Sequence, residues 1–433
     1  MLAVGGWADG YTDSILRMLD HLDVCTKAII GPWGHTWPER PVPGPAIGFL
    51  QECLRWWGHW LKGVDNGVQR DPAVRYYLQD ACALTPGLVY RPGRWMQTES
   101  LTKRNCREFS FAADGTLRAN SDGKGGLVSL CSPLVCGTQV DTWLPMGSSI
   151  DLPSEQTPDD ERSACFDTAE LEESFDIVGQ PIVRLRVASN KPNAFIFVRL
   201  CDVWPDGSSQ LVTRGNLNLT HRDSHEYPEP LAIGEFYDVQ VPLKAVAQTV
   251  PAGHQIRISL STSYWTWIWP SPEMATVTVD CSESHVVLPM GGEQDVPLTR
   301  PFEPAEIARG ERPDYVPAGG YRCERTFDPA SNTMTYRRWT NDFKALSTPS
   351  GMSVEADKVA AYRIAEGDPL SAHMETRRFE RFSREGWEVE LEVNSSMDCD
   401  ERDFIIETKS RASCDGRGVL DETHRIRVPR DLN

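Results

Sequence analysis

The sequence predicts a mostly β protein with a partial α/β region at its N-terminal end. Many short segments alternate apolar and polar residues between Asp-Gly and Pro-rich turn signals, which is typical of a β-sandwich. Residues 1–62 read instead as strand, helix, strand, helix. The 14 Trp and 31 Pro, with little regular helical pattern elsewhere, also favour β structure.

Four elements are predicted in the first 62 residues. Residues 2–6 and 27–31 are apolar strands, and residues 11–23 have the apolar spacing of a helix. A second helix is predicted from residue 46 to residue 61, with its apolar side chains on one side: Ile47, Leu50, Leu54, Trp57 and Leu61. This alternation predicts parallel strands, and two such strands form no stable sheet alone. We therefore expect residues 1–62 to be the end of a larger sheet whose earlier strands are not in this chain.

Two polar residues follow the predicted strands directly. Asp9 comes after the first strand and His35 after the second. Functional side chains of open α/β sheets lie at the carboxyl ends of strands, and an acid followed by a histidine is the order of the last two triad residues in α/β-hydrolases. On spacing alone, a surface Asp and a structural His remain the alternative reading.

From residue 71 onward the pattern is one of short strands. The clearest predicted strands are residues 182–187, 194–200, 217–219, 236–243, 255–262, 276–279 and 286–288. Residues 137–164 are rich in Pro, Ser, Asp and Glu and read as a long surface loop. The aromatic run YWTWIWP at residues 264–270 is interpreted as packing rather than as a ligand platform. His254 is interpreted as a hydrogen-bonded structural histidine.

The last section, residues 291–433, is predicted to be a small antiparallel β-unit. A Pro-rich stretch at residues 297–318 reads as its linker, and the alternating charges beyond residue 376 indicate one wet face. No chemistry is predicted for this section.

Composition and charge exclude several classes of protein. The net charge of −18 argues against binding to nucleic acids or anionic membranes, and no run of about 18 apolar residues exists. No signal peptide is visible, and the 12 scattered Cys form no disulfide or zinc pattern, so we expect reduced thiols in a cytoplasmic protein. The spacing of the His residues predicts no metal site, and no cofactor is expected.

Several motifs together resemble one family of serine hydrolases. In the N-terminal part these motifs are GGWADGY at residues 5–11, GPWGH at 31–35 and RWWGHWLKG at 55–63. In the later part they are RLCDVWPDG at 199–207, LNLTHR at 217–222, GHQIR at 253–257 and YWTWIWPSP at 264–272. In this order they resemble the CocE/NonD hydrolases, which are relatives of X-Pro dipeptidyl-peptidases and cocaine esterase. The resemblance covers residues 1–290.

The resemblance implies an architecture and a reaction. Residues 1–70 would be the C-terminal part of an α/β-hydrolase domain, residues 71–290 a jelly-roll β-sandwich, and residues 291–433 a β-rich extension. The implied function is that of a serine hydrolase of peptide, amide or ester bonds, acting on a small-molecule or peptide substrate. Asp9 corresponds to the triad acid and His35 to the triad base.

The chain departs from this family in one respect, because it contains no Gly-x-Ser-x-Gly nucleophile elbow. The nearest candidates, GSS at residues 147–149 and GMS at residues 351–353, lie outside the α/β segment and lack the second Gly. We therefore expect the isolated chain to be inactive and the nucleophile to come from an upstream polypeptide.

Two alternatives stay open at this point. The first is a non-catalytic β-sandwich protein that binds a ligand or partner and carries a vestigial hydrolase tail. The second is a hydrolase with a different nucleophile, such as one of the 12 Cys, although no Cys shares the loops of Asp9 and His35.

Overall fold

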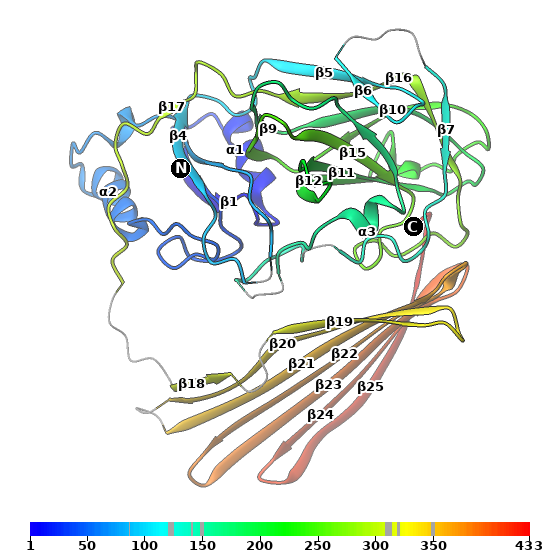
Figure 1. Ribbon diagram of the computed structural model, residues 1–433. Coiled ribbons are helices and arrows are strands. Elements are labelled where there is room, and N and C mark those ends of the chain that lie inside the picture. Colours follow the sequence, from blue (N-terminus) through cyan, green and yellow to red (C-terminus); the bar gives the residue numbers. More distant parts are fainter. Residues whose placement is uncertain are drawn as a thin grey trace.

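The computed structural model describes residues 1–85, 87–119, 125–139, 142–147, 151–307, 314–317, 321–347 and 351–433. Within these ranges the strands form four sheets, and the protein is mostly β as predicted. An N-terminal unit and a β-sandwich lie side by side, and a sheet of long C-terminal strands lies below them in Figure 1.

The N-terminal unit alternates strands and helices as predicted. Its elements are β1 (Leu2–Gly6), α1 (Thr12–His21), β2 (Lys27–Gly31) and α2 (Phe49–Lys62), followed by a short 3-10 turn at Val68–Arg70. β1 and β2 are parallel, with Ala3 opposite Ala28. α1 buries Ile15 and Leu16 against the face of β2 that carries Ala28 and Ile30.

The sheet that contains β1 and β2 continues into later parts of the chain. Its further strands are β3 (Val74–Gln79), β4 (Gly93–Thr98), β9 (Phe175–Gly179), β14 (Val246–Val250) and β17 (Val296–Pro297). β3 is parallel to β2, and the order across the sheet is β1-β2-β3-β14-β9. The sheet thus extends beyond residue 70, where the α/β-hydrolase part was expected to end. Among the described strands, β1 pairs with β2 alone and forms one edge of the sheet.

Helix α2 turns its apolar side to solvent. Leu54 is 73% exposed and Leu61 is 74% exposed, while Leu50 and Trp57 are also exposed. The side facing the sheet buries Glu52 and Trp56 instead. Glu52 forms ion pairs with Arg75 of β3, at 2.8 Å, and with Arg300. The ion pairs of the buried Glu52 therefore help to join the helix to the sheet, and the apolar side chains of the predicted stripe, from Leu50 to Leu61, have no cover among the described residues.

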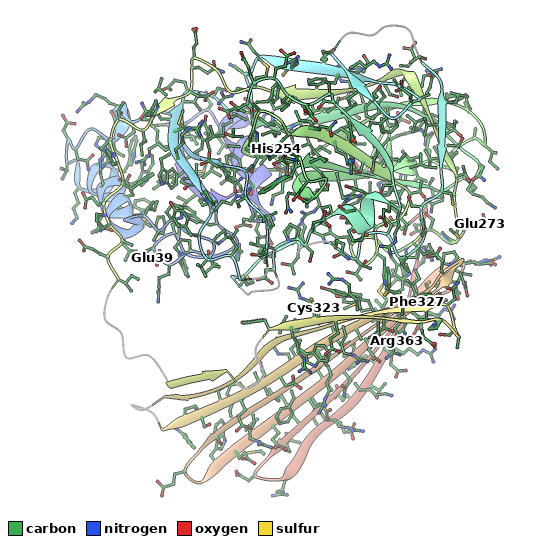
Figure 2. The ribbon with its side chains drawn as sticks, viewed as in Figure 1. Glu39, His254, Glu273, Cys323, Phe327 and Arg363 are labelled. Atoms are coloured by element: carbon green, nitrogen blue, oxygen red, sulfur yellow. The ribbon has the colours of Figure 1, made fainter. Side chains whose placement is uncertain are left out.

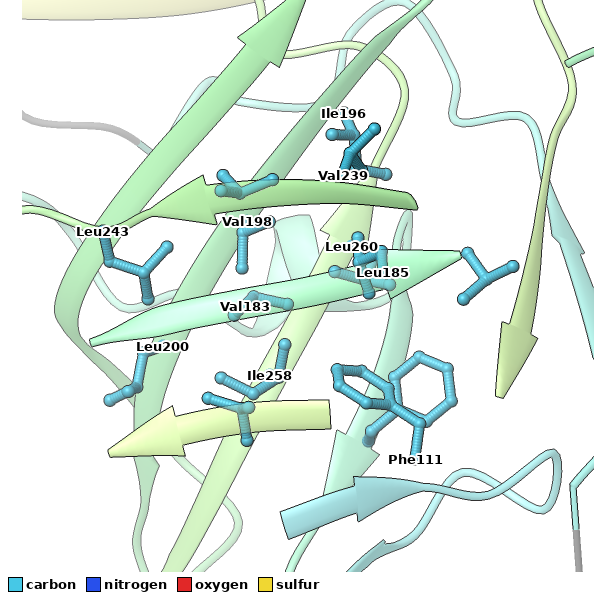
Figure 3. Packing of buried hydrophobic residues seen from close by; sticks show 14 of the residues in the cluster. Phe111, Val183, Leu185, Ile196, Val198, Leu200, Val239, Leu243, Ile258 and Leu260 are labelled. Atoms are coloured by element: carbon cyan, nitrogen blue, oxygen red, sulfur yellow. The ribbon is translucent and has the colours of Figure 1, made fainter. Parts of the chain in front are cut away.

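The sandwich packs two sheets face to face. One contains β5 (Cys106–Phe111), β6 (Leu117–Arg118), β7 (Leu127–Leu130), β10 (Ile182–Ser189), β13 (Tyr237–Pro242) and β16 (Val277–Pro289). The other contains β8 (Ala164–Asp167), β11 (Phe195–Val203), β12 (Ser209–Asn218) and β15 (Gln255–Ser261), with a 3-10 turn at Leu219–His221 after β12. Val183 and Leu185 of one sheet meet Val198, Leu200 and Ile258 of the other in a core from which solvent is excluded (Figure 3).

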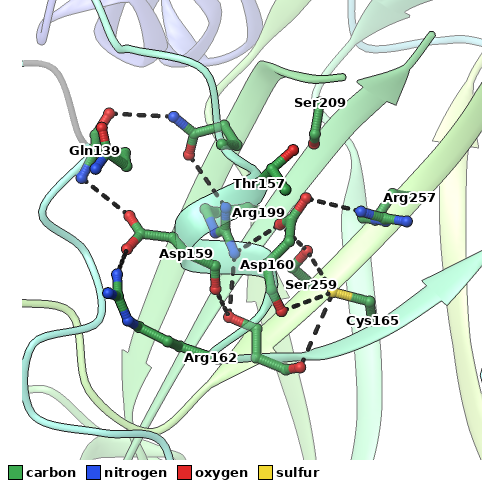
Figure 4. A network of polar contacts seen from close by, with 12 residues as sticks. Gln139, Thr157, Asp159, Asp160, Arg162, Cys165, Arg199, Ser209, Arg257 and Ser259 are labelled. Atoms are coloured by element: carbon green, nitrogen blue, oxygen red, sulfur yellow. Dashed lines mark hydrogen bonds and ion pairs between the residues drawn. The ribbon is translucent and has the colours of Figure 1, made fainter. Parts of the chain in front are cut away.

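The segment predicted as a surface loop at residues 137–164 is partly buried. It contains the short helix α3 (Thr157–Asp160), whose Asp159 and Asp160 are both buried. Asp160 forms ion pairs with Arg199, at 2.8 Å, and Arg257, at 2.9 Å, both on strands of the sandwich (Figure 4). The acidic composition suggested solvent exposure, but the Asp160 carboxylate neutralises Arg199, which is buried in the sandwich, and the partly buried Arg257.

The C-terminal section forms an antiparallel sheet that is larger than predicted. Its strands are β18 (Asp314–Pro317), β19 (Arg322–Asp328), β20 (Thr333–Ser347), β21 (Met352–Ala365), β22 (Asp368–Arg384), β23 (Trp387–Cys399), β24 (Asp403–Cys414) and β25 (Arg417–Pro429). Cys323 and Phe327 mark β19, at the edge of the sheet beside the sandwich (Figure 2). Ile364 and Ala372 of the sheet pack against Leu134 and Trp265 of the sandwich.

The first part of the predicted linker packs against the N-terminal unit. Phe302 packs edge-on against Trp95 of β4 at 4.7 Å between ring centroids, and Glu303 O accepts a hydrogen bond of 2.7 Å from Gly48 N. Residues 308–313 and 318–320 of this stretch lie outside the described residues.

Candidate active site

Asp9 and His35 lie side by side at the carboxyl ends of two neighbouring parallel strands. Asp9 follows β1 and His35 follows β2, and the Nδ1 atom of His35 is 3.0 Å from Oδ2 of Asp9. The neutral tautomer that satisfies this contact carries its proton on Nδ1 and donates it to the carboxylate. Nε2 then keeps a free lone pair, which is the form of histidine that accepts a proton.

The backbone after β1 holds Asp9 in place. Asp9 N donates to Gly6 O at 2.9 Å, and Oδ1 of Asp9 accepts from Tyr11 N at 2.9 Å. The hydroxyl of Thr12 donates to Asp9 O at 2.7 Å. One carboxylate oxygen is therefore fixed by the backbone and the other faces His35, so the buried carboxylate has a single orientation.

The two loops that carry Asp9 and His35 are also tied to each other. Trp7 N donates to Gly31 O at 2.8 Å, and Ala8 N donates to Trp33 O at 3.0 Å. The indole N–H of Trp7 donates to Tyr77 O of β3 at 2.7 Å. These bonds extend the β1–β2 ladder beyond the strand ends, so the separation of Asp9 and His35 is set by the sheet itself.

The side chain of His35 is open to solvent on one side. It is 44% exposed, whereas the side chain of Asp9 is 12% exposed. Among the described residues, Asp9 is the one side chain that hydrogen bonds to the imidazole. Nε2 is thus free to accept a proton from a group that is not among the described residues.

A segment far away in the sequence, residues 142–147, lies against the loops that carry Asp9 and His35, and we call it the covering segment. Pro145 O accepts a hydrogen bond of 2.6 Å from His35 N. The ring of Trp143 meets Tyr11 edge-on at 5.0 Å, and Tyr11 meets the ring of His35 at 5.8 Å. Tyr11 thus contacts both the imidazole of His35 and the ring of Trp143.

Two glycines make this close approach sterically feasible. A Cβ atom at Gly10 would lie 2.6 Å from Trp143 O, and one at Gly34 would lie 2.6 Å from Pro145 O. Any other residue at either position would push the covering segment away. Gly10 and Gly34 belong to the GGWADGY and GPWGH motifs, but nothing in the sequence pointed to Trp143 or Pro145 as their neighbours.

The candidate serines of the sequence do not complete the site among the described residues. Ser353 lies in β21 of the C-terminal sheet, not on the sheet that carries His35. Ser148 and Ser149 lie outside the described residues.

Two buried cysteines have the features of inert thiols. All 12 are free, and burial raises the pKa of the thiols of Cys201 and Cys136 well above the ordinary value, to about 12 for Cys136. A thiol with a raised pKa is not an activated nucleophile at neutral pH.

His254 has a carboxylate partner of its own. Its Nδ1 lies 2.7 Å from Oδ1 of Asp202, which is 2% exposed. Both residues lie on or next to strands of the sandwich, β11 and β15. His254 is hydrogen bonded as predicted.

Neither a metal cluster nor a bilayer-spanning helix occurs among the described residues. Within the described ranges, no group of three or more His, Cys, Asp or Glu side chains is arranged to hold a metal ion. None of the helices described has the length and apolar character needed to cross a bilayer.

Comparisons with known proteins identify relatives over the first two thirds of the chain. A family model described as the X-Pro dipeptidyl-peptidase C-terminal non-catalytic domain matches residues 66–299. A Mycobacterium bovis protein named as a serine esterase is 25% identical over 286 residues, which cover 59% of this chain and 44% of that protein. Cocaine esterase from Rhodococcus is 23% identical over 292 residues, which cover 60% of this chain and 48% of that enzyme.

A solved structure has a similar fold. The structure of an α-amino acid ester hydrolase matches with a TM-score of 0.53 at 18% identity, over 67% of this chain and 55% of that one. The chain spans less than half the length of the two curated relatives. Asp9 and His35 precede the range that the family model matches.

Proposed function

The chain belongs to the X-Pro dipeptidyl-peptidase C-terminal family, and from this membership we propose that it is the C-terminal part of a serine hydrolase. The observation that carries the proposal is the 3.0 Å contact between Asp9 and His35 at the ends of adjacent parallel strands. The names of the relatives, a serine esterase and cocaine esterase, support the same class of reaction. The proposed substrates are small-molecule or peptide esters and amides.

Asp9 and His35 act as the acid and the base of a catalytic triad. Asp9 holds the proton on Nδ1 of His35 and stabilises the imidazolium that forms when Nε2 takes a second proton. A serine hydroxyl gives its proton to Nε2 and its oxygen attacks the substrate carbonyl. His35 then returns the proton to the leaving group, which leaves an acyl-enzyme.

The second half of the reaction uses the same base. His35 takes a proton from water, the hydroxide oxygen attacks the acyl-enzyme, and the serine oxygen leaves with the proton from His35. The ring of Tyr11, which meets the imidazole at 5.8 Å, would contact the substrate groups next to the scissile bond, and Trp143 packs edge-on against that ring. No step of this mechanism uses a metal ion or an organic cofactor.

The nucleophile comes from an upstream polypeptide that completes the N-terminal sheet. The outer edge of β1 offers backbone N–H and C=O groups that pair with no described strand. The apolar side of α2, with Leu50, Leu54, Trp57 and Leu61, is exposed on the same unit. An added strand beside β1 and a helix against α2 would cover both, because parallel sheets are normally buried on both faces.

A non-catalytic binding protein is the alternative function. It requires the chain to be stable and monodisperse alone. The uncovered apolar helix counts against it, because monomeric proteins rarely expose large contiguous apolar patches.

The nucleotide sequence of the source DNA on the 5′ side of the Met1 codon tests the proposal. We expect an in-frame continuation or an adjacent reading frame that encodes a Gly-x-Ser-x-Gly elbow after a predicted strand. A stop codon and a promoter with no such frame nearby would contradict the proposal and favour the binding protein.

A further inference from the structure

Asp151 holds both ends of the covering segment. Its backbone carbonyl accepts a hydrogen bond of 3.1 Å from Thr142 N, at the start of the segment. Its Oδ2 atom accepts one of 2.8 Å from Met146 N, near the end. Between these two bonds lie Trp143 and Pro145, the residues that contact Tyr11 and His35. The conformation of the covering segment therefore depends on Asp151, through its backbone carbonyl at one end and its carboxylate at the other.

That carboxylate is neutralised by the C-terminal sheet. Oδ1 of Asp151 lies 2.7 Å from a terminal guanidinium nitrogen of Arg338 on β20. The pair is largely buried, since the side chain of Arg338 is 16% exposed and that of Asp151 is 7% exposed. A buried carboxylate needs such a counter-charge, and loss of one partner leaves the other charge uncompensated. Arg338 thus holds the carboxylate of Asp151, and that carboxylate in turn holds the covering segment at Met146 N.

Two further contacts join the same sheet to the chain that leads into the covering segment. Arg325 of β19 donates to Thr138 O at 2.7 Å. The carboxylate of Glu366, at the turn after β21, accepts hydrogen bonds from Leu134 N at 3.1 Å and Val135 N at 3.3 Å. The sheet therefore supports this part of the chain at several points, and Arg338 is the contact nearest to His35 along the chain of hydrogen bonds.

We propose that Arg338 is a positioning residue for the Asp9–His35 site and that the C-terminal sheet acts through it on the wall of that site. The path runs from Arg338 to Asp151, then to the covering segment, and then to the backbone of His35 and the ring of Tyr11. Its consequence for catalysis rests on the proposed function, whereas the structural link does not. The C-terminal section, for which the sequence predicts no chemistry, would then determine the shape of the substrate site.

Hydrogen–deuterium exchange of the full chain tests the structural link. We expect Arg338→Ala to speed the exchange of the amides of His35, Thr142 and Met146 by about tenfold or more, because each donates a bond that depends on the covering segment. Arg338→Lys, which keeps the charge, should restore much of the protection. Arg338→Met keeps the apolar stem and serves as a second variant if the alanine variant folds poorly.

The matched control is Arg377→Ala. Arg377 lies on β22 of the same sheet and pairs with Glu392 at 3.2 Å on an exposed part of it. It should leave the exchange of all three amides unchanged. Unchanged exchange in Arg338→Ala, or an equal rise in the Arg377 variant, would overturn the proposal.

Hydrolysis by the chain completed with its serine-bearing polypeptide tests the catalytic consequence. We expect Arg338→Ala to lower kcat/KM about tenfold at an unchanged melting temperature of the sandwich, with recovery in Arg338→Lys. Faster exchange with unchanged kcat and KM would reduce Arg338 to a structural role and overturn the proposal. Absence of hydrolysis in the wild-type assembly, with the exchange result intact, would instead refute the proposed function.

Discussion

At the scale of residues, the partners of each carboxylate decide its role. Asp9 shares its two oxygens between a backbone N–H and an imidazole, so it can orient a base. Asp160 faces the buried Arg199 and the partly buried Arg257 and holds a loop on the sandwich. Burial raises the pKa of the neighbouring Asp159 above its ordinary value, although Arg199 and the N–H groups of Gln139 and Gly137 oppose the shift.

Asp71 illustrates how arginine partners of a carboxylate make the free energy of unfolding depend on pH. Burial alone would raise its pKa, but hydrogen bonds from Arg55 and the charges of Arg75 and Arg300 bring that pKa below its ordinary value. A carboxylate whose pKa is lower in the folded state stabilises the fold at pH values above its unfolded-state pKa of about 3.9. This stabilisation is lost as the pH falls through the folded-state pKa.

We predict that Asp71→Asn lowers the free energy of unfolding by about 1.5–3 kcal/mol at pH 7. The difference from wild type should begin to shrink below about pH 4, where Asp71 becomes protonated in the unfolded state, and should vanish below the lowered pKa of the folded state. Urea unfolding between pH 3 and pH 7 measures it. Asp65→Asn is the control, because Asp65 pairs with Arg70 on an exposed surface, with side chains 80% and 75% exposed. A pH-independent difference would contradict the assignment.

At the scale of elements, α2 is the part whose surroundings differ most from its sequence pattern. The helix was predicted for residues 46–61, but it begins three residues later, at Phe49, and ends at Lys62. The apolar side chains of its predicted stripe, from Leu50 to Leu61, face solvent, and its buried side carries Glu52. Periodicity identifies an amphipathic helix but not what covers it. The ion pairs of Glu52 with Arg75 and Arg300 join residues 23 and 248 positions apart, which no local pattern reveals.

We predict that the double variant Leu54→Ser, Trp57→Ser lowers apolar-dye binding and aggregation of the isolated chain. Its free energy of unfolding should change by less than about 0.5 kcal/mol, because both side chains are exposed. Dye fluorescence and thermal unfolding measure the two effects. The control is Trp56→Ser on the buried side of the same helix, which should destabilise strongly. A large loss of stability in the double variant would mean that this side is packed after all.

At the scale of the whole molecule, three parts are joined by long-range contacts. The N-terminal sheet takes strands from residues 2 to 297, so the unit that carries Asp9 and His35 is built together with the sandwich. Trp265 packs the sandwich against Ile364 and Ala372 of the C-terminal sheet. The aromatic run at residues 264–270 is thus used in packing, as interpreted from the sequence.

We predict that Trp265→Ala loosens the C-terminal sheet from the sandwich. Trp265 is 1% exposed, so its truncation should cost about 3–5 kcal/mol and increase the radius of gyration in small-angle scattering. Trp37→Ala, which removes a Trp that is 67% exposed, should leave both quantities unchanged. An unaltered radius of gyration in the Trp265 variant would show that other contacts hold the sheet.

The sequence predicted the parts of the site that depend on local order. Asp9 and His35 follow adjacent parallel strands, so their proximity follows from the strand–helix–strand pattern. Trp143, Pro145 and Arg338 could not be found in this way, because they reach the site through contacts between residues more than 100 positions apart in the chain. The burial of Asp160 was equally hidden, since its partners Arg199 and Arg257 lie on distant strands.

Ester hydrolysis by the chain co-expressed with the elbow-bearing polypeptide tests the central claim most directly. We predict hydrolysis that is lost in His35→Ala, falls by about 10⁴-fold in Asp9→Asn and is unchanged in His424→Ala, which alters an exposed histidine on β25. Full activity in the His35→Ala assembly would contradict the assignment of His35 as the base and, with it, the account of this chain as part of a serine hydrolase.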